Sequence, residues 1–116
     1  MNNMNLAQFT GTENYWRSNK MFAPNMVHTD GVQYFIEQAH AYWFLDFVAI
    51  TVFPLLKQHP FLSVQLLVKD DSTATITVED GNSEPLMTEE IDYTDCPSGE
   101  YHFFLTDNVF LLTNEY

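Results

Sequence analysis

The feature that most constrains the fold is a long apolar stretch at residues 29–53, TDGVQYFIEQAHAYWFLDFVAITVF. Its apolar side chains recur at spacings of three and four residues, which is the pattern of an amphipathic helix. Thr29 or Asp30 could cap the first free amides, and the helix dipole favours the negative charge of Asp30 there. Asp46 is the only charge in residues 41–56. The second half of this helix is therefore expected to be covered on nearly all sides.

A membrane-spanning segment is the rival interpretation of the same stretch. Such a segment needs a run of about 18 or more apolar residues. Glu37, Asp46 and Lys57 interrupt this one, so the uncharged runs are too short and we expect no membrane partner. Pro54 lacks an amide hydrogen, and the helix should therefore end, kink or restart there.

After the helix, the apolar period changes to that of β-strands. Residues 61–69 and 73–79 alternate between apolar and polar side chains. Two paired strands must place their apolar side chains on the same face of the sheet. A register shift of one residue would move every side chain of a strand to the opposite face. We therefore expect Val68 to pair with Ala74 and Leu66 with Ile76, across a short loop.

Further strands are expected towards the C-terminus. In residues 86–93 the acidic Glu89 falls on the apolar side, which indicates a strand at the edge of a sheet. Residues 101–105 and 109–112 flank Asp107-Asn108 and predict a hairpin in which Phe104 faces Leu111. Both faces of this hairpin are apolar, so either the N-terminal segment or a second copy of the chain should cover the outer one.

These patterns predict a single α+β domain over residues 1–116, with one long central helix packed on a four- to five-stranded antiparallel meander sheet. The N-terminal segment, with residues 19–27 as a loop, would close one end. A chain of 116 residues can bury a sizeable core without a staple. The lone cysteine, Cys96, and the lack of a charged-then-apolar leader predict a cytoplasmic location.

The net charge of −12 is unevenly distributed along the chain. Residues 1–69 contain four acidic and four basic side chains, whereas residues 70–116 contain twelve acidic side chains and no Lys or Arg. Nucleic-acid affinity comes largely from Lys and Arg that neutralise phosphates, so direct nucleic-acid binding by this half is disfavoured.

A basic protein surface is the partner that this charge favours. The sequence thus predicts a non-enzymatic interaction or inhibitor protein, whose acidic side could imitate nucleic acid toward a basic host protein. A solvated surface that only maintains solubility is the plainer interpretation. The partner-binding residues would be Asp70, Asp71, Glu79, Asp80, Glu84, Glu89, Glu90, Asp92 and Asp95.

A small-ligand pocket at the start of the helix is the second functional hypothesis. Tyr15, Trp16, Arg17, His28 and Asp30 flank the helix start, and such side chains could bind a ligand by stacking and hydrogen bonds. An aromatic lid over the core would explain the same residues without a ligand.

No specific catalytic motif is present, although three arrangements can be weighed as an enzymatic hypothesis. Asp46, in the most apolar segment, could be a carboxylate with a raised pKa, or it could bond Tyr42 or a group across the core. Cys96 with His102 could form a nucleophile, but acidic neighbours raise a thiol pKa. Glu89 and Glu90 are adjacent on a strand and point to opposite faces, so they cannot act together.

The histidines give no metal-ligand spacing, and the sequence carries no cofactor-binding motif. They are His28, His40, His59 and His102. A hydrolase built on a metal held by carboxylates and histidines brought together in space stays open at this point, although structural or solvated histidines are the simpler expectation. We expect no bound metal and no cofactor.

Six short segments, spread over nearly the whole chain, resemble those of a small family of domains of unknown function from bacteria, their plasmids and phages. The segments are FTGTE at 9–13, HTDGV at 28–32, AYWFLD at 41–46, EDGN at 79–82, IDYTD at 91–95 and EY at 115–116. The family pattern has Tyr where this chain has His28, and Leu where it has Phe44. The resemblance implies no known activity, but it implies an origin in a mobile element and therefore favours a protein that acts on host machinery.

Overall fold

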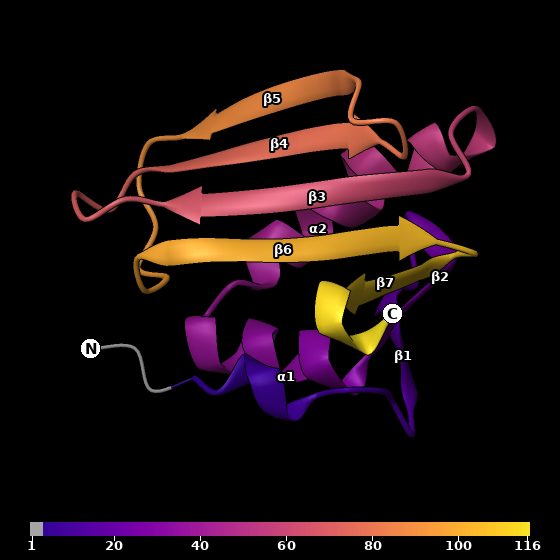
Figure 1. Cartoon of the computed structure of the whole chain (residues 1–116), viewed down its shortest axis with the longest axis horizontal. Coiled ribbons are helices and arrows are strands. Elements are labelled where there is room, and N and C mark those ends of the chain that lie inside the picture. The colour runs from indigo at the N-terminus through magenta and orange to yellow at the C-terminus, as the bar shows by residue number, and fades with distance from the viewer. Residues whose placement is uncertain (1–3) are drawn as a thin grey trace.

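The computed structural model describes residues 4–116, whose strands form one twisted sheet (Figure 1). The strands are β1 (Tyr15–Asn19), β2 (Ala23–Thr29), β3 (Phe61–Val68), β4 (Ala74–Asp80), β5 (Pro85–Ile91), β6 (Gly99–Thr106) and β7 (Val109–Leu112). Their order in the sheet is β1-β2-β7-β6-β3-β4-β5. The helical elements are η1 (Leu6–Gln8), α1 (Asp30–Ala39), α2 (Tyr42–Phe47), the π-helical turn η2 (Val48–Val52), the 3₁₀ turn η3 (Phe53–Lys57) and η4 (Thr113–Glu115).

The hairpin of β3 and β4 is confirmed in the predicted register. Val68 pairs with Ala74, and Leu66 pairs with Ile76. The even-numbered residues of β3 are consequently buried on the core face. The expected edge strand is also confirmed, because β5 ends the sheet and Glu89 is exposed on it.

The C-terminal hairpin of β6 and β7 is confirmed as well. Phe104 pairs with Leu111, and the turn residues Asp107 and Asn108 have φ values of 57° and 65°. Positive φ at both turn positions matches the twist of the two flanking strands, and Asp and Asn tolerate it better than most residues.

The predicted four- to five-stranded antiparallel meander is wrong, because the sheet has seven strands and mixed directions. Residues 19–27, expected as a loop, contribute to β1 and β2. Strand β2 runs parallel to β7, with Val27 opposite Val109. Strand β6 pairs with β3, whereas a meander would place β6 next to β5. Pro24 and Asn25 interrupt the apolar alternation of β2, so its pairing depends on a distant strand that local periodicity does not reveal.

The predicted single long helix over residues 29–53 is also wrong. Helix α1 ends at Ala39, and His40 adopts the left-handed conformation with φ 54°. Phe35 and Phe44 lie nine positions apart, which is two and a half turns, so a straight helix would point them in opposite directions. The break turns both rings into one core, where they lie 5.3 and 5.2 Å from the ring of Phe103.

Both ends of the helical region follow the predicted chemistry. Thr29 is the N-cap of α1, and its side chain accepts a hydrogen bond from the amide of Val32 at 3.3 Å. Pro54 lies in the first turn of η3, where the helix restarts with a different winding after the π-helical turn. A missing amide is tolerated there because the first amides of a helical turn have no partner within it.

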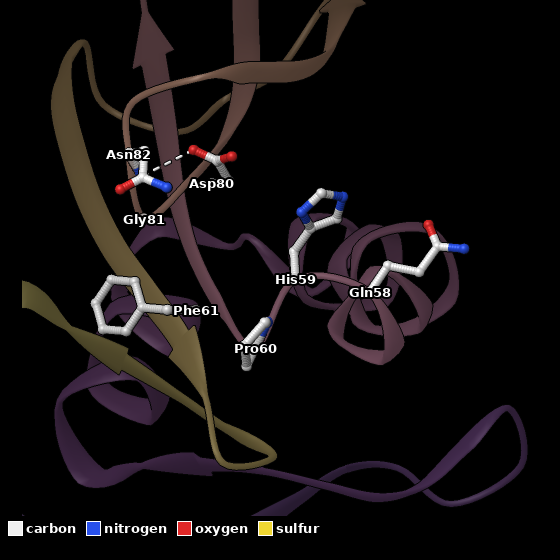
Figure 2. Close-up of a pocket in the computed structure, with 7 residues that line it drawn as sticks. All are labelled: Gln58, His59, Pro60, Phe61, Asp80, Gly81 and Asn82. Atoms are coloured by element: carbon white, nitrogen blue, oxygen red, sulfur yellow. Dashed lines mark hydrogen bonds between the residues drawn. The ribbon is translucent and has the colours of Figure 1, made fainter.

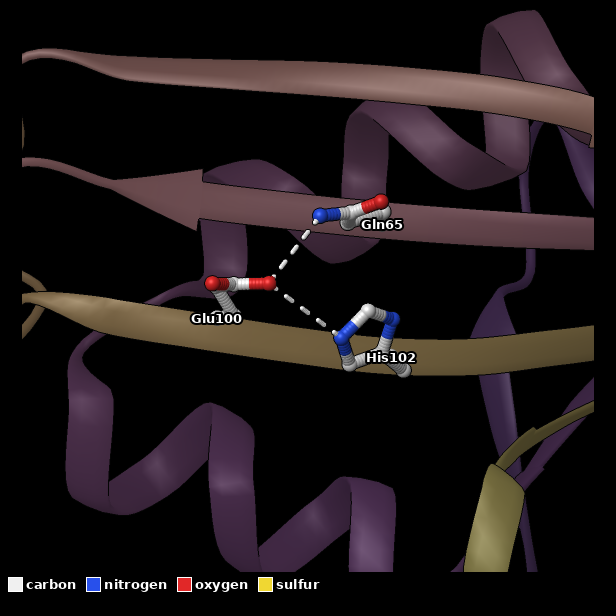
Figure 3. A network of polar contacts seen from close by, with 3 residues as sticks. All are labelled: Gln65, Glu100 and His102. Carbon is white, nitrogen blue, oxygen red and sulfur yellow. Dashed lines mark hydrogen bonds and ion pairs between the residues drawn. The ribbon is translucent and has the colours of Figure 1, made fainter.

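The two faces of the sheet differ in character. In Figure 1, α2 crosses behind β3 and β6, on the face that carries the buried side chains. The opposite face is polar along most of these strands. There Glu100 accepts a hydrogen bond from Gln65 at 3.5 Å and lies 3.7 Å from His102, as Figure 3 shows.

An aromatic cluster occupies one end of the polar face. The rings of Phe61 and Phe104 lie 4.9 Å apart, and Tyr116 contacts them at 5.5 and 5.3 Å. Tyr116 therefore covers part of the outer face of the C-terminal hairpin at Phe104. The sequence pattern instead predicts the N-terminal segment or a second copy of the chain in that place. Dimerisation through this face stays a prediction.

Candidate functional site

Segments that are distant in sequence meet at the first turn of α1. The carboxylate of Asp30 accepts hydrogen bonds from the indole of Trp16 at 2.9 Å and from the amides of Glu13 and Asn14 at 3.1 and 3.3 Å. In return, the hydroxyl oxygen of Thr12 accepts from the amide of Asp30 at 2.9 Å. The Trp16 bond, followed by the backbone amides, lowers the pKa of Asp30 against the opposing effect of burial.

The C-terminal Glu115 completes this junction from the other end of the chain. Its carboxylate accepts from the hydroxyl of Thr29 at 2.6 Å, from the amide of Leu112 at 2.9 Å and from the amide of Gly31 at 3.1 Å. A Cβ on Gly31 would lie 2.7 Å from both the Glu115 carboxylate and Leu112. A larger residue at position 31 would therefore require the ends of these two side chains to shift, and with them the hydrogen bonds of Glu115. Sequence reasoning missed Glu115, although the EY segment marked its position.

Next to the junction, the buried imidazole of His28 connects β1, β2 and α1. Its Nδ1 lies 2.8 Å from the hydroxyl of Ser18, and its Nε2 lies 2.6 Å from the amide oxygen of Gln33. The amide nitrogen of Gln33 donates to Glu37 at 2.8 Å, which fixes the orientation of that amide, so Nε2 must carry the ring proton. Burial lowers the pKa of His28, while the Gln33 hydrogen bond raises it by less.

The five residues of the predicted pocket are therefore used in different ways. Trp16 and Asp30 are in direct contact, whereas His28 is enclosed in its own hydrogen-bond network. Arg17 donates to a backbone carbonyl of β2 at 3.3 Å, and Tyr15 is exposed. Beside Asp30 lies a hollow of about 460 Å³. It is lined by Gln8, Phe9, Thr10, Gly11, Thr12, Glu13 and Asp30.

The predicted acidic residues gather around the β5 edge of the sheet, and we call them the acidic rim. Two lie in the β3–β4 turn, two at the end of β4, one in the β4–β5 turn, two on β5 and two in the loop that follows (Figure 1). In that order they are Asp70, Asp71, Glu79, Asp80, Glu84, Glu89, Glu90, Asp92 and Asp95. Glu79 and Asp80 are half-buried, and the other seven are exposed.

Basic side chains do not neutralise this rim. Within residues 4–116 the only ion pair shorter than 4.0 Å joins His102 and Glu100, neither of which belongs to the rim. Arg17 and Lys20 lie at the opposite edge, on β1 and in the turn after it, and Lys57 ends η3. Lys69 adjoins the β3–β4 turn and acts on Asp71 only through space, as a minor cause of its lowered pKa.

Two rim carboxylates have structural roles in their turns. Asp71 accepts from the hydroxyl and the amide of Thr73 at 2.6 and 3.1 Å, which lower its pKa. Asp80 accepts from the amides of Glu84 and Asn82 at 2.9 and 2.8 Å, which lower its pKa in that order of effect. Both amides donate to the same oxygen of Asp80, Oδ1.

A pocket of about 340 Å³ opens beside Asp80, at the corner of the sheet where β3 begins and β4 ends (Figure 2). Its walls are Gln58, His59, Pro60, Phe61, Asp80, Gly81 and Asn82. Figure 2 shows the ring of Phe61 on one side and the imidazole of His59 on the other, with the β4–β5 turn above. Of these residues, sequence reasoning assigned only Asp80 to a binding surface, although the EDGN segment marked the turn.

The structure also places the three catalytic candidates. Asp46 is exposed on α2 and accepts from the side-chain amide of Asn19 at 3.3 Å. It therefore lacks the apolar burial that the sequence suggested. Glu89 pairs opposite Ile76 on the core-facing side of β5, while Glu90 accepts from the Thr75 hydroxyl on the other face at 2.9 Å.

Cys96 lies in the loop before β6 and is buried. Burial raises the pKa of its thiol to about 11, more than the Tyr101 hydrogen bond lowers it, and the charge of Asp95 raises it further. The sulfur contacts the carbonyl of Pro97 at 3.7 Å. A thiol in this state is a poor nucleophile, because the thiolate is the reactive form.

No group of three or more His, Cys, Asp or Glu side chains within residues 4–116 has the geometry to hold a metal ion. In the same part of the chain, no helix combines the length and apolar character needed to cross a membrane.

Comparison with known proteins connects these features to a family. No curated protein and no solved structure matches the chain. A sequence model of the DUF6876 family, described as a family of unknown function, matches residues 1–116. The resemblance inferred from the six short segments is thereby confirmed at the level of the family, and the chain belongs to the DUF6876 family.

Proposed function

We propose that this protein is a non-enzymatic interaction protein whose acidic rim binds a basic surface on a partner protein. The observation that carries the proposal is a rim of nine carboxylates without a Lys or Arg in ion-pair contact among residues 4–116. Unneutralised carboxylates at one edge create a negative potential that attracts and orients cationic partners.

The geometry of the rim supports contact with an extended partner. Strand β5 ends the sheet, so its outer backbone groups have no strand beside them. Two acidic residues, Glu89 and Glu90, lie near the C-terminal end of β5. The others lie at the end of β4, in the β3–β4 and β4–β5 turns and in the loop after β5. The negative charges are thus concentrated at one edge of the sheet, and the proposed partner is a DNA-binding or defence protein of a bacterial host whose basic surface normally contacts nucleic acid.

A pull-down from a bacterial host lysate tests this proposal with two variants of equal charge. A rim variant combines Glu89→Gln, Glu90→Gln and Asp92→Asn, and a control variant combines Glu13→Gln, Glu37→Gln and Asp46→Asn. Each variant removes three negative charges and takes the formal net charge from −12 to −9. All six side chains are exposed.

The wild-type chain and the control variant should retain the same basic protein at low salt and release it at high salt, because screening weakens contacts between exposed charges. The rim variant should retain less of it. Equal capture by both variants, or capture that persists at high salt, would contradict the proposal.

The second candidate function is small-ligand binding in the hollow beside Asp30, favoured by its volume of about 460 Å³ and by the ring of Phe9 in its wall. Three donors already occupy the Asp30 carboxylate, so we expect a ligand to contact the other lining residues, 8–13. Chemical-shift changes at residues 8–13 in a screen of small polar compounds would support this candidate, whereas shifts confined to the rim would not.

A further inference from the structure

We propose that a second copy of this chain packs on the outer face of the helical segment at residues 42–57. This inference goes beyond the proposed function, because the acidic rim lies at the β5 edge and outside this face. It depends on three observations: an exposed apolar surface, a groove beside it, and a charge distribution that fits an antiparallel pair of these segments.

The helical segment runs from α2 through η2 into η3 without a break. The residues at both junctions keep right-handed helical dihedral angles, although the winding changes there. Tyr42, Asp46 and Ile50 follow one another at spacings of four residues, which places them on the same side of a helix. All three are exposed, so this side of the segment is not covered by the rest of the chain.

The turn between β1 and β2 extends the apolar surface. Met21 and Phe22 are 79% and 65% exposed. Asn19 joins this turn to the segment, since its side-chain oxygen accepts from the amide of Phe22 at 2.9 Å and its side-chain nitrogen donates to Asp46 at 3.3 Å. The turn and the segment carry four of the eight large hydrophobic side chains that are exposed within residues 4–116. Exposed apolar side chains gathered in this way are typical of interaction surfaces.

A groove of about 440 Å³ lies where this turn meets η3. Its walls are Phe22, Asn25, Phe53, Pro54, Leu56, Lys57 and Asn108. Most of these walls are apolar, and the single charged wall residue is basic. The groove can therefore bury an apolar side chain of a partner and place a positive charge beside it.

The distribution of charge favours a second copy as that partner. Two chains with a net charge of −12 repel each other, so contact costs least where acidic side chains are few and basic ones are present. Three of the four Lys and Arg side chains lie around this face, on β1, in the turn after it and at the end of η3: Arg17, Lys20 and Lys57. The acidic side chains there are Asp46 on α2 and Asp107 beside the groove.

An antiparallel pair of these segments is complementary to itself. Residues 46 and 57 lie equally far from a point between residues 51 and 52, and so do residues 50 and 53. A two-fold axis through that point sets Asp46 of one copy opposite Lys57 of the other, and Ile50 opposite Phe53. The symmetry repeats each contact. Within residues 4–116, neither Asp46 nor Lys57 makes an ion pair in its own chain.

Charge-swap variants test this arrangement by sedimentation velocity over a series of protein concentrations. Asp46→Lys and Lys57→Asp each set like charges opposite one another at two symmetric positions, and each should weaken the dimer by about tenfold. Asp46→Lys changes the formal net charge from −12 to −10, which on total charge alone would strengthen association. The double variant restores opposite charges at a net charge of −12 and should dimerise as the wild-type chain does.

A second pair of variants tests the apolar contact. Ile50→Glu places a like charge near the two-fold axis and should weaken the dimer by about tenfold or more. Tyr93→Glu is the matched control, because it replaces another exposed hydrophobic side chain, in the loop after β5, and adds the same single charge. The control should dimerise as the wild-type chain does, and circular dichroism would verify that both variants are folded.

Three results would overturn the inference. The first is a wild-type chain that stays monomeric at the millimolar concentrations used for NMR. The second is a dimer that tolerates Ile50→Glu and both single charge variants, since it must then use another face, such as the outer face of the C-terminal hairpin. The third is a dimer that the double charge variant fails to restore, which would contradict the antiparallel pairing. None of these results bears on binding by the acidic rim.

Discussion

The first turn of α1 and the β5 edge both concentrate carboxylates, yet they use them in opposite ways. At the junction, Asp30 and Glu115 each accept three hydrogen bonds from groups of this chain. On the rim, most carboxylates point into solvent, and Asp71 and Asp80 accept only from their own turns. The difference shows that a carboxylate is available to a partner only where the chain itself places few hydrogen-bond donors beside it.

Replacing Glu115 with alanine should have the largest effect on stability. The hydroxyl of Thr29 and the amides of Gly31 and Leu112 lose their acceptor, and donors left without a partner are costly when they are buried. We expect a loss of about 3 kcal/mol in the free energy of unfolding, measured by urea denaturation. Glu84→Ala on the rim is the control, and an equal loss there would remove the contrast between the two regions.

Gly31→Ala tests the close packing of the same junction. The added methyl group would meet Glu115 and Leu112 at 2.7 Å, and overpacking of this kind costs about 2 kcal/mol. Gly11→Ala is the matched control, because no atom lies within 4 Å of a Cβ at that position. Urea denaturation measures the free energy of unfolding of both variants. Equal values for Gly31→Ala and Gly11→Ala would show that the junction has room for the added methyl group.

Trp16→Phe removes the indole donor to Asp30 and should have a smaller, pH-dependent effect. At neutral pH we expect a loss of about 0.5 kcal/mol, since solvent screens this carboxylate. Folding lowers the pKa of Asp30 below its ordinary value of 3.8. The stabilisation is therefore complete above that value and is lost as the pH falls through the folded pKa.

The stability difference between wild-type and Trp16→Phe chains should accordingly shrink in acid. Urea denaturation in a series of buffers from neutral pH down to pH values below the ordinary aspartate pKa would measure it. A difference that stays constant across the series would show that the indole stabilises the junction by packing alone.

The rim variant should have the smallest effect on stability. Substitutions at exposed positions usually change the free energy of unfolding by less than about 0.5 kcal/mol, and Glu90→Gln keeps an oxygen that can accept from the Thr75 hydroxyl. Reduced repulsion among the rim carboxylates acts in the stabilising direction. Thermal and urea denaturation of the rim and control variants side by side would check this. A loss above about 1 kcal/mol would mean that the rim is part of the folded framework.

Local pattern was enough to predict the hairpins and to limit the cap of α1 to Thr29 or Asp30. Val68 opposite Ala74, Phe104 opposite Leu111 and Thr29 as N-cap all follow from alternation, parity and side-chain chemistry within a few residues. The parallel pairing of β2 with β7 could not be predicted in this way, because it joins distant segments and β2 is interrupted by polar residues.

The helix break and the sites show the same limit. A left-handed His40 carries no strong local signal, since glycine or asparagine usually occupies that position. The position of the acidic rim followed from charge counting, but the roles of Asp30, Glu115 and the Asp80 pocket needed the tertiary contacts. For Glu115, only the EY segment of the family resemblance marked the position in the sequence.

The most direct test of the central claim is the salt dependence of binding to a basic probe. The affinity of an oligo-lysine peptide is measured over a series of salt concentrations for the wild-type chain, the rim variant and the control variant of the same net charge. If the rim carboxylates are available and locally concentrated, the wild-type chain and the control variant will lose affinity steeply with salt, and the rim variant will show a shallower slope. Identical slopes for the rim and control variants would contradict the account.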